Sequence, residues 1–224
     1  MHLTFDIDWA PDYILEDLCY LLEGFNIKAT FFSTHSSPFI NSYIQKNHEI
    51  GIHPNFNPNF EGTGKHFKLI IDELLELFPM SKGIRSHSLA QNSQTILYCS
   101  EKGIKYDSSI FIPYQLKPYL DFCDIYRIPF QQSDFQMIVN KKFVPDFNKI
   151  DCKIPYTFLF HPIHIYLNTK NLNEYEKAKV YINDYKRFKE FKNDYKQIGI
   201  RNSFKRIISN KFHFTLLNDL LKGL

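Results

Sequence analysis

The segment Thr4-Phe5-Asp6-Ile7-Asp8-Trp9 ends an apolar stretch on two carboxylates. Alternate side chains of a β-strand point to the same face, so Asp6 and Asp8 are predicted to lie side by side. Two neighbouring carboxylates repel each other unless a cation or a shared proton lies beside them. The segment therefore indicates a cation-binding or acid/base site. The alternative is a strand end at which one Asp caps the next helix and the other is solvated.

The composition is sufficient for one sizeable hydrophobic core. The chain has 224 residues, of which 44% are hydrophobic, and a single α/β barrel of this length is ordinary. Acids and bases nearly balance, with a net charge of +3, so we expect no nucleic-acid partner. The cysteines form no CxxC pair, which favours reduced thiols over a zinc knuckle or a disulfide scaffold: Cys19, Cys99, Cys123 and Cys152.

The sequence also bears on the compartment. A secretory signal would place a basic region, an apolar run and a small-residue cleavage site before the first strand, and the chain instead enters that strand directly. Its longest apolar runs fall short of the roughly 18 residues that span a bilayer. We therefore expect a cytoplasmic protein without a transmembrane segment.

Strand-like and helix-like segments alternate along most of the chain. Apolar strands are predicted at residues 3–7, 27–32, 49–53, 83–87, 104–106, 126–129 and 157–160. Between them, apolar residues at helical spacing predict helices at 12–24, 37–47, 67–78 and 94–102. Strands and helices that alternate through short connections favour βαβ units and a mostly parallel sheet or barrel.

The character of the chain changes near residue 173. We predict a barrel domain over residues 1–172 and a helical, basic C-terminal extension over 173–224, packed on the barrel. Helices are expected at 174–196 and from 204 to the end. The basic segment 186–211 is either a solvated face or a contact for an anionic substrate or membrane surface, so peripheral membrane contact through this tail stays open.

Titratable side chains follow five of the predicted strands. In α/β barrels the carboxyl ends of the strands all open on one face, where the active site lies. The residues that the chain delivers to this face are Asp6, Asp8, His35, His53, Arg85, His87 and His161. Their coincidence at successive strand ends predicts one shared site.

The residue types suggest the chemistry of this site. One Asp and two His suit a divalent, Zn-like ion with an open position for water, whose proton the ion makes easier to remove. A second carboxylate beside the ion can serve as general base, and an imidazole on the opposite wall can protonate a leaving group. Arg85 can pair with the base carboxylate and fix its orientation.

In these motifs the chain resembles the NodB-type polysaccharide deacetylases, and most closely the branch associated with surface-polysaccharide biosynthesis. The resemblance covers roughly residues 1–170 in order and spacing. The matching stretches are residues 4–9 (TFDIDW), 29–35 (ATFFSTH), 49–57 (EIGIHPNFN), 85–89 (RSHSL), 106–109 (YDSS) and 160–168 (FHPIHIYLN).

The resemblance implies a distorted (β/α) barrel of about seven strands and a metal-dependent removal of the acetyl group from an N-acetylated sugar. By the family's motifs, Asp6 is the base and Asp8 the metal-binding carboxylate, while His53 is the first metal histidine. Arg85 orients the base, and His161 is the acid that protonates the departing amine.

Four features of the sequence depart from the family's pattern. Asn57 stands where the second metal histidine is usual, and Ile7 splits the usual adjacent Asp pair. The Ser86-His87 pair replaces a proline and an aromatic residue, and the fourth motif survives only as 131–134 (QQSD), without its Trp. Because an amide is a poor transition-metal ligand, the third ligand is expected to be His35, with His87 as its substitute.

Several further residues are candidates for contact with a sugar. Trp9 either stacks on the sugar or packs in the core, and Asp107 either lines the groove or forms a turn. The loop residues Asn55 and Asn57, together with His87, complete the expected substrate-binding set.

The sequence thus predicts a cytoplasmic deacetylase with one divalent ion, whether Zn, Co, Ni, Mn or Fe. Its expected substrate is an N-acetylated, nucleotide- or lipid-linked precursor of a surface glycan such as O-antigen, capsule or lipopolysaccharide. Two alternatives remain. Asn57 suggests a catalytically degenerate carbohydrate-binding or accessory barrel. The same barrel and metal would also suit hydrolysis of another amide or an imide.

Overall fold

The computed structural model describes residues 1–144 and 146–223. Within these ranges, the strands form one sheet in the order β6-β7-β5-β4-β3-β2-β1-β9-β8, with β1 flanked by β2 and β9. The strands are β1 (His2–Asp8), β2 (Thr30–Ser33), β3 (Glu49–Ile52), β4 (Gly83–Ile84), β5 (Tyr106–Asp107), β6 (Tyr119–Leu120), β7 (Tyr126–Arg127), β8 (Gln132–Ser133) and β9 (Thr157–Phe160).

One stretch of chain joins the two ends of this curved sheet. Its first residues form β7, which pairs in parallel with β5, and its last residues form β8, which pairs in parallel with β9. The antiparallel pair in the sheet is that of β6 with β7. When β7 and β8 are counted as one strand and β6 is left out, the sheet corresponds to the distorted (β/α) barrel of about seven strands that the sequence predicts. This prediction of the fold class is confirmed.

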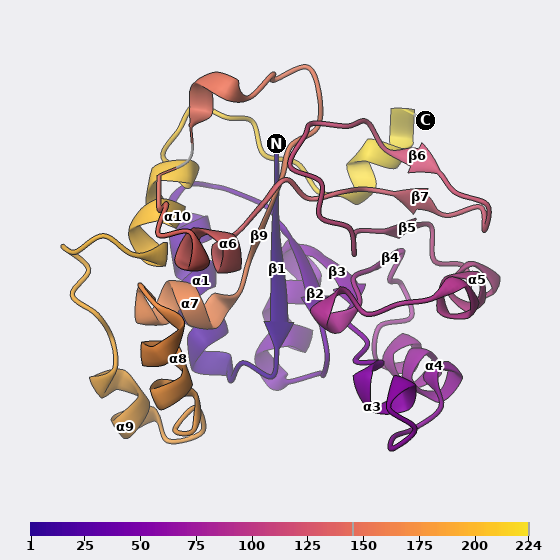
Figure 1. The fold of residues 1–224 in the computed structure, drawn as a ribbon, viewed down its shortest axis with the longest axis horizontal. Coiled ribbons are helices and arrows are strands. Elements are labelled where there is room, and N and C mark those ends of the chain that lie inside the picture. The colour runs from indigo at the N-terminus through magenta and orange to yellow at the C-terminus, as the bar shows by residue number, and fades with distance from the viewer. Residues whose placement is uncertain (145, 224) are drawn as a thin grey trace.

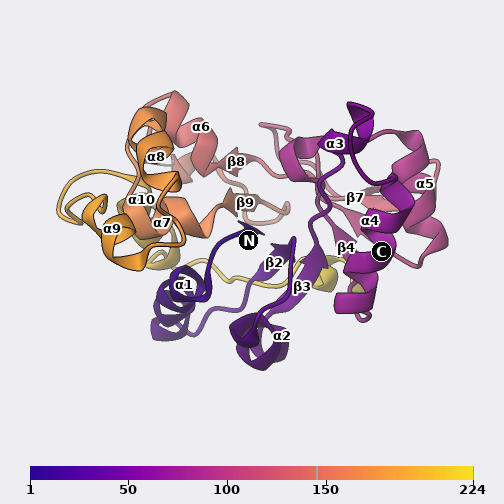
Figure 2. The same ribbon diagram turned by 90° about the horizontal axis from the view of Figure 1, so that it is seen from below.

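Helices cover the outside of the barrel. In Figure 1, α1, α7 and α10 lie on one side of β1, and α4 and α5 lie on the other. Figure 2 shows the same arrangement from the carboxyl end of β1. The helices are α1 (Asp12–Gly24), α2 (Gln45–Asn47), α3 (Asn57–Phe60), α4 (Phe67–Leu77), α5 (Ser93–Glu101), α6 (Asp134–Val139), α7 (Pro162–Leu167), α8 (Leu172–Lys179), α9 (Tyr185–Glu190) and α10 (Ile200–Ile208).

Local sequence explains where these helices begin and which face they bury. In α1 the residues at helical spacing, Ile14, Leu15, Leu18 and Leu22, are all buried. The side chain of Asn92 accepts a hydrogen bond from the backbone of Thr95, and the Thr95 hydroxyl accepts one in return, which is a capping box at the start of α5. The predicted helix 37–47 is instead a π-helical turn, Ile40–Ile44, followed by α2.

The C-terminal helices are shorter than the sequence pattern suggests. The predicted helix 174–196 is divided into α8 and α9, because the Asp184 side chain accepts a hydrogen bond from the backbone N–H of Arg187 and starts a new helix. The predicted helix from 204 onward already begins at Ile200 and ends at Ile208, and residues 218–223 form a 3₁₀ helix. Within the described ranges, none of the helices is both long and apolar enough to cross a bilayer.

The segment after residue 173 contacts the barrel domain along its side and at the amino end of its strands. On one side, the ring of Phe204 in α10 packs edge-on against Phe5 and Phe160, at centroid distances of 5.8 and 5.3 Å. At the amino end of the strands, the backbone N–H of Thr215 donates to the carbonyl of Met1, and the N–H of Asn218 donates to the Glu49 carboxylate (3.2 Å). The part of the C-terminal segment around residues 215–218 therefore lies at the amino ends of the strands, whereas α8 and α9 lie toward the carboxyl end of β1 (Figure 1).

The absence of a side chain at position 83 in β4 makes room for the ring of Tyr106. A Cβ atom at Gly83 would lie 2.1 Å from the Tyr106 ring, whose hydroxyl donates to Glu49 (2.7 Å). We expect Gly83→Ala to destabilise the fold by about 1–3 kcal/mol, the usual cost of overpacking a core. Gly24→Ala is the matched control, because its Cβ would meet nothing within 4 Å. Equal urea midpoints for the two variants would contradict this account of the packing.

Candidate active site

The end of β1 presents both of its carboxylates to one site, although not through simple alternation. Asp6 pairs with Phe32 of β2 and Asp8 pairs with the next residue, Ser33, so Ile7 is an extra residue and forms a β-bulge. Asp8 also has a left-handed backbone, with φ of 50°. The bulge and this backbone turn set the direction of the Asp8 side chain.

Arg85 follows β4 and fixes the first carboxylate. Its guanidinium is fully buried and donates to Asp6 Oδ1 (2.9 Å) and Thr4 Oγ1 (2.8 Å). It also donates to the carbonyl (2.9 Å) and hydroxyl (2.7 Å) oxygens of Ser108. A buried cation with this many fixed acceptors cannot turn away, so Asp6 is held in one orientation.

His53 follows β3, and its surroundings define which of its nitrogens carries the proton. Nδ1 lies 2.5 Å from the backbone carbonyl of Arg85, which can only accept, so Nδ1 must donate. In the neutral ring, Nε2 is therefore an acceptor. Yet Nε2 lies 3.2 Å from Asp8 Oδ1 and 3.9 Å from Asp6 Oδ2. The lone pair of Nε2 would repel those of the carboxylate oxygens at these distances. The contact therefore requires a second proton on the His53 ring or a cation between Nε2 and the oxygens.

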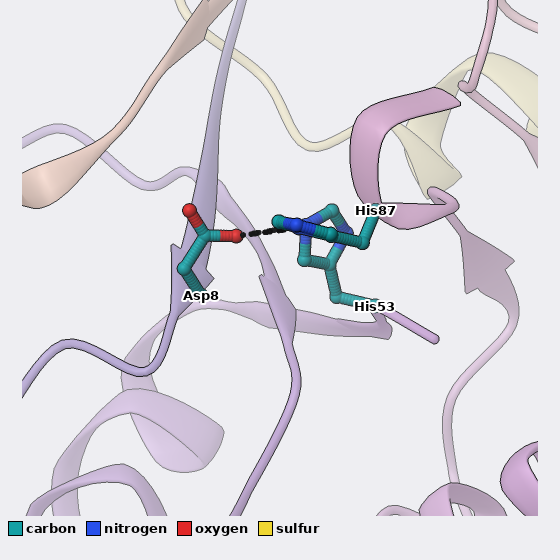
Figure 3. A group of neighbouring side chains, drawn as sticks. All are labelled: Asp8, His53 and His87. Atoms are coloured by element: carbon teal, nitrogen blue, oxygen red, sulfur yellow. Dashed lines mark hydrogen bonds and ion pairs between the residues drawn. The ribbon is translucent and has the colours of Figure 1, made fainter. Parts of the chain in front are cut away.

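His87 completes the group around Asp8. Its Nδ1 lies 3.0 Å from Asp8 Oδ1, and the rings of His53 and His87 are 5.4 Å apart (Figure 3). One ligand atom each from Asp8, His53 and His87 lies within 4.8 Å of the others. Burial disfavours the charged form of Asp8, but hydrogen bonds with His53 and His87 and the charge of His161 hold its pKa well below the usual value. The group thus combines an ionised carboxylate with two imidazoles.

His161 faces this group from the end of β9. Its Nδ1 lies 2.9 Å from Oδ1 of the fully buried Asp134, and its Nε2 lies 4.0 Å from Asp8 Oδ2. Burial lowers the pKa of His161, but the charge and hydrogen bond of Asp134, together with the charges of Asp8 and Asp6, outweigh it and raise the pKa to about 10. His161 is therefore an imidazolium at neutral pH, with Nε2 directed toward the carboxylates.

His164 lies one helical turn further along, in α7. Its Nδ1 lies 3.1 Å from the Thr169 hydroxyl, and burial lowers its pKa to about 4. Ligand atoms of Asp134, His161 and His164 form a second group within 4.8 Å. Because His161 Nδ1 already donates to Asp134, that second group serves as a hydrogen-bonded support for His161.

A cavity of about 410 Å³ opens between these two groups. Asp6, His53 and His87 line one part of it, and His161 and Ser133 line another. The remaining wall is largely apolar and consists of Leu89, Phe130, Phe135 and Leu159 together with Ser88. The cavity therefore joins acidic and basic groups to a surface suited to a small apolar substituent.

The other predicted site residues lie at various distances from this cavity. His35 is outside the group of Asp8, His53 and His87, and its Nδ1 lies 3.1 Å from the backbone carbonyl of Asp8. Trp9 is 54% exposed, with its ring edge-on to that of His87 at 5.2 Å, so the core alternative for Trp9 does not apply. Asn57 begins α3, and its backbone N–H donates to the Asn55 side chain (3.1 Å).

Asp107 is not brought to the cavity. It is fully buried and pairs with Arg127 Nη1 at 2.9 Å, which leaves it no surface for a sugar. Its position at the end of β5 fits the strand-end rule, but the following chain covers it. Conversely, Asp134 was noted in the sequence only as the remnant of a motif, and its position next to His161 became evident only in the fold. Thr4 and Ser108, which hold Arg85, carried no signal beyond their place in matching stretches.

Comparisons with known proteins identify the family of the chain. A family model described as "WbmS-like: Polysaccharide deacetylase" matches residues 3–179. A search of curated protein sequences finds no significant match. Among solved structures, a Bordetella bronchiseptica protein assigned to O-antigen biosynthesis as a polysaccharide deacetylase is 31% identical. The alignment covers 94% of this chain and 90% of that chain, with a TM-score of 0.84.

More distant structures share the fold alone. The peptidoglycan deacetylase PdaC of Bacillus subtilis is 12% identical over 99% of this chain and 89% of that chain, with a TM-score of 0.51. A Bacillus anthracis pseudoenzyme of carbohydrate esterase family 4 is 12% identical over 98% of this chain and 64% of that chain, with a TM-score of 0.50. The fold is thus common to active and inactive proteins.

The Asp134–His161 pair predicts that two neighbouring histidines, His161 and His164, lose their protons at very different pH values. In metal-free protein, NMR should show His161 losing its proton near pH 10 and His164 near pH 4. Because the folded pKa of His161 exceeds the unfolded value of 6.5, its contribution to stability is complete below pH 6.5 and is lost as pH rises toward 10. Asp134→Asn should lower the His161 pKa and remove this dependence. An unchanged His161 titration in Asp134→Asn would contradict the pairing.

Proposed function

Because the chain belongs to the WbmS-like polysaccharide deacetylases, we propose that it hydrolyses the acetamide of an N-acetylated sugar at the cavity between Asp8 and His161. The observation that carries this proposal is the geometry of His53. Its Nε2 can only accept in the neutral ring and yet lies 3.2 Å from Asp8 Oδ1, as expected of ligands arranged around a divalent ion.

The donor set around Asp8 fits such an ion. A carboxylate and two imidazoles are the protein ligands of many catalytic zinc sites, which keep a further position open. We assign Asp8, His53 and His87 as the ligands, so His87 takes the place that Asn57 cannot fill. The Arg85 carbonyl on His53 Nδ1 supplies the outer hydrogen bond that fixes a metal-binding histidine. A divalent ion held here would make bound water easier to deprotonate and polarise the acyl carbonyl.

Two side chains of the protein are placed to carry out the two proton transfers of the reaction. Asp6, with Oδ1 held by Arg85, is placed to take a proton from the attacking water. His161 carries a proton on the Nε2 that faces the cavity, and it is placed to deliver this proton to the departing amine. Water thus supplies a hydroxyl group to the acetyl carbon and a proton to the amine, and the products are acetate and an amino sugar.

The remaining contacts suggest how the substrate lies. The apolar wall of Leu89, Phe130 and Leu159 suits the acetyl methyl group, and exposed Trp9 beside His87 offers a face on which a sugar ring can stack. The assignment of the similar Bordetella protein to O-antigen biosynthesis supports a precursor of a surface glycan as the substrate class.

A second candidate function is a binding or accessory barrel without turnover. Asn57 at the usual histidine position favours it, and a pseudoenzyme with this fold shows that the barrel can persist without activity. Metal content separates the two candidates, because a binding module has no need of the ion.

The first test is the dependence of acetate release on metal. We expect the purified protein to bind one divalent ion and to release acetate from a nucleotide- or lipid-linked N-acetyl sugar. A chelator should abolish release, and added Zn²⁺ or Co²⁺ should restore it. Simple cyclic imides and formamides serve as comparison substrates. Failure to release acetate with metal restored would oppose the deacetylase assignment, and preferred cleavage of an imide would change the substrate class.

The second test separates the base from the ligands. Asp6→Asn should reduce turnover by about a hundredfold or more, the scale of general-base assistance, while metal content stays unchanged. His53→Ala is its counterpart and should lose the ion, because it removes a ligand atom. Full metal content in His53→Ala, or full turnover in Asp6→Asn, would contradict the respective role.

A further inference from the structure

The backbone of Asp8 adopts a conformation that its neighbours must maintain. Its φ of 50° lies in the left-handed region, which residues with a side chain rarely adopt, although Asp tolerates it better than most. The same residue ends the bulge in β1, where Ile7 has no partner on β2. Without further contacts, this peptide would be free to return to an extended conformation, and the Asp8 side chain would then point elsewhere.

Two side chains from the chain segment after β2 converge on the carbonyl of Asp8. The Thr34 hydroxyl donates to it, and His35 Nδ1 lies 3.1 Å from the same oxygen. Because a carbonyl can only accept, His35 must carry its proton on Nδ1. The two donors also touch each other, with 3.0 Å between Thr34 Oγ1 and His35 Nδ1. Both lone pairs of the Asp8 carbonyl are therefore occupied.

The segment that supplies these donors is itself fixed. The Ser33 hydroxyl donates to the carbonyl of His35 (2.6 Å), and the backbone N–H of His53 donates to the carbonyl of Ser33 (2.8 Å). The donors thus stand on a strand end that hydrogen-bonds to the strand end of His53. The hydrogen bond between these two strand ends therefore fixes the donors to the Asp8 carbonyl relative to the backbone of His53.

We propose that Thr34 and His35 are positioning residues that clamp the left-handed Asp8 peptide and so aim its carboxylate at His53 and His87. The inference rests on the proposed function to the extent that Asp8 is a metal ligand. It gives His35 a task different from the ligand role expected from the sequence. His35 holds the ligand's backbone and contributes no atom to the group of Asp8, His53 and His87.

The test compares metal affinity with and without the clamp. In Thr34→Val/His35→Leu, both donors are lost, and Zn²⁺ affinity measured against a chromogenic chelator should fall about 10–100-fold, the usual cost of losing support around a metal ligand. Thr34→Ser keeps the hydroxyl and should retain wild-type affinity, as should the neighbouring control Ser36→Ala. Affinity within twofold of wild type in the double variant would overturn the proposal. If the double variant does not fold, Thr34→Val against Thr34→Ser gives the comparison for the Thr34 donor, and His35→Leu alone gives it for the His35 donor.

A crystal structure of metal-free Thr34→Val/His35→Leu makes the inference independent of the proposed function. We expect the Asp8 peptide to leave the left-handed region and Asp8 Oδ1 to move away from His53 Nε2. An Asp8 backbone that keeps its φ near 50° without the two donors would refute the clamp. Failure of the wild-type protein to bind Zn²⁺ would instead refute the proposed metal site, and the crystal comparison would still decide the role of Thr34 and His35.

Discussion

The buried residue Arg85 holds the candidate site together. Its guanidinium stacks on the ring of Phe32 (4.4 Å) and lies near that of Phe130 (5.3 Å), while it donates to Asp6, Thr4 and Ser108. Its backbone carbonyl accepts a hydrogen bond from Nδ1–H of His53. One residue therefore orients the candidate base and fixes the proton position of a candidate metal ligand. Removing one partner of a fully buried ion pair costs about 3–5 kcal/mol, so this arrangement is also part of the fold.

The two walls of the cavity have complementary electrostatic roles. Behind the wall that His53 and His87 line, Asp8 stays ionised beside these two imidazoles, which suits the binding of a cation. On the other wall, the buried Asp134 keeps His161 protonated, which suits the delivery of a proton. The pair Asp134–His161 raises one histidine pKa while burial lowers that of the adjacent His164. Separation of pKa values within one site is a usual sign of assigned acid and base roles.

The sequence predicted the barrel because alternating apolar segments and helical spacing are local signals. It also predicted that Asp6, Asp8, His53 and His161 meet, since strand ends in a parallel barrel share one face. Alternation could not reveal the bulge at Ile7, which changes how Asp8 reaches the site. The choice between His35 and His87 as the third ligand depended on the geometry of the loops that carry them, which sequence spacing does not encode.

Burial was the other feature beyond reach of the sequence. Asp107 follows its strand as the site residues do, but it is covered and pairs with Arg127. Asp134 lies in the remnant of the fourth motif, 131–134, and its contact with His161 joins two separate segments of the chain. The division of the predicted helix 174–196 into α8 and α9 depends on one capping side chain, Asp184, which the charge pattern around it did not reveal.

The central claim is that Asp8, His53 and His87 together hold one divalent ion. Anomalous diffraction at the zinc or cobalt edge, from crystals grown with that metal, tests it most directly. The account predicts one strong peak within bonding distance of Asp8, His53 Nε2 and His87. A peak beside Asp134 and His164, or bound metal with the Asp8 group left vacant, would contradict it.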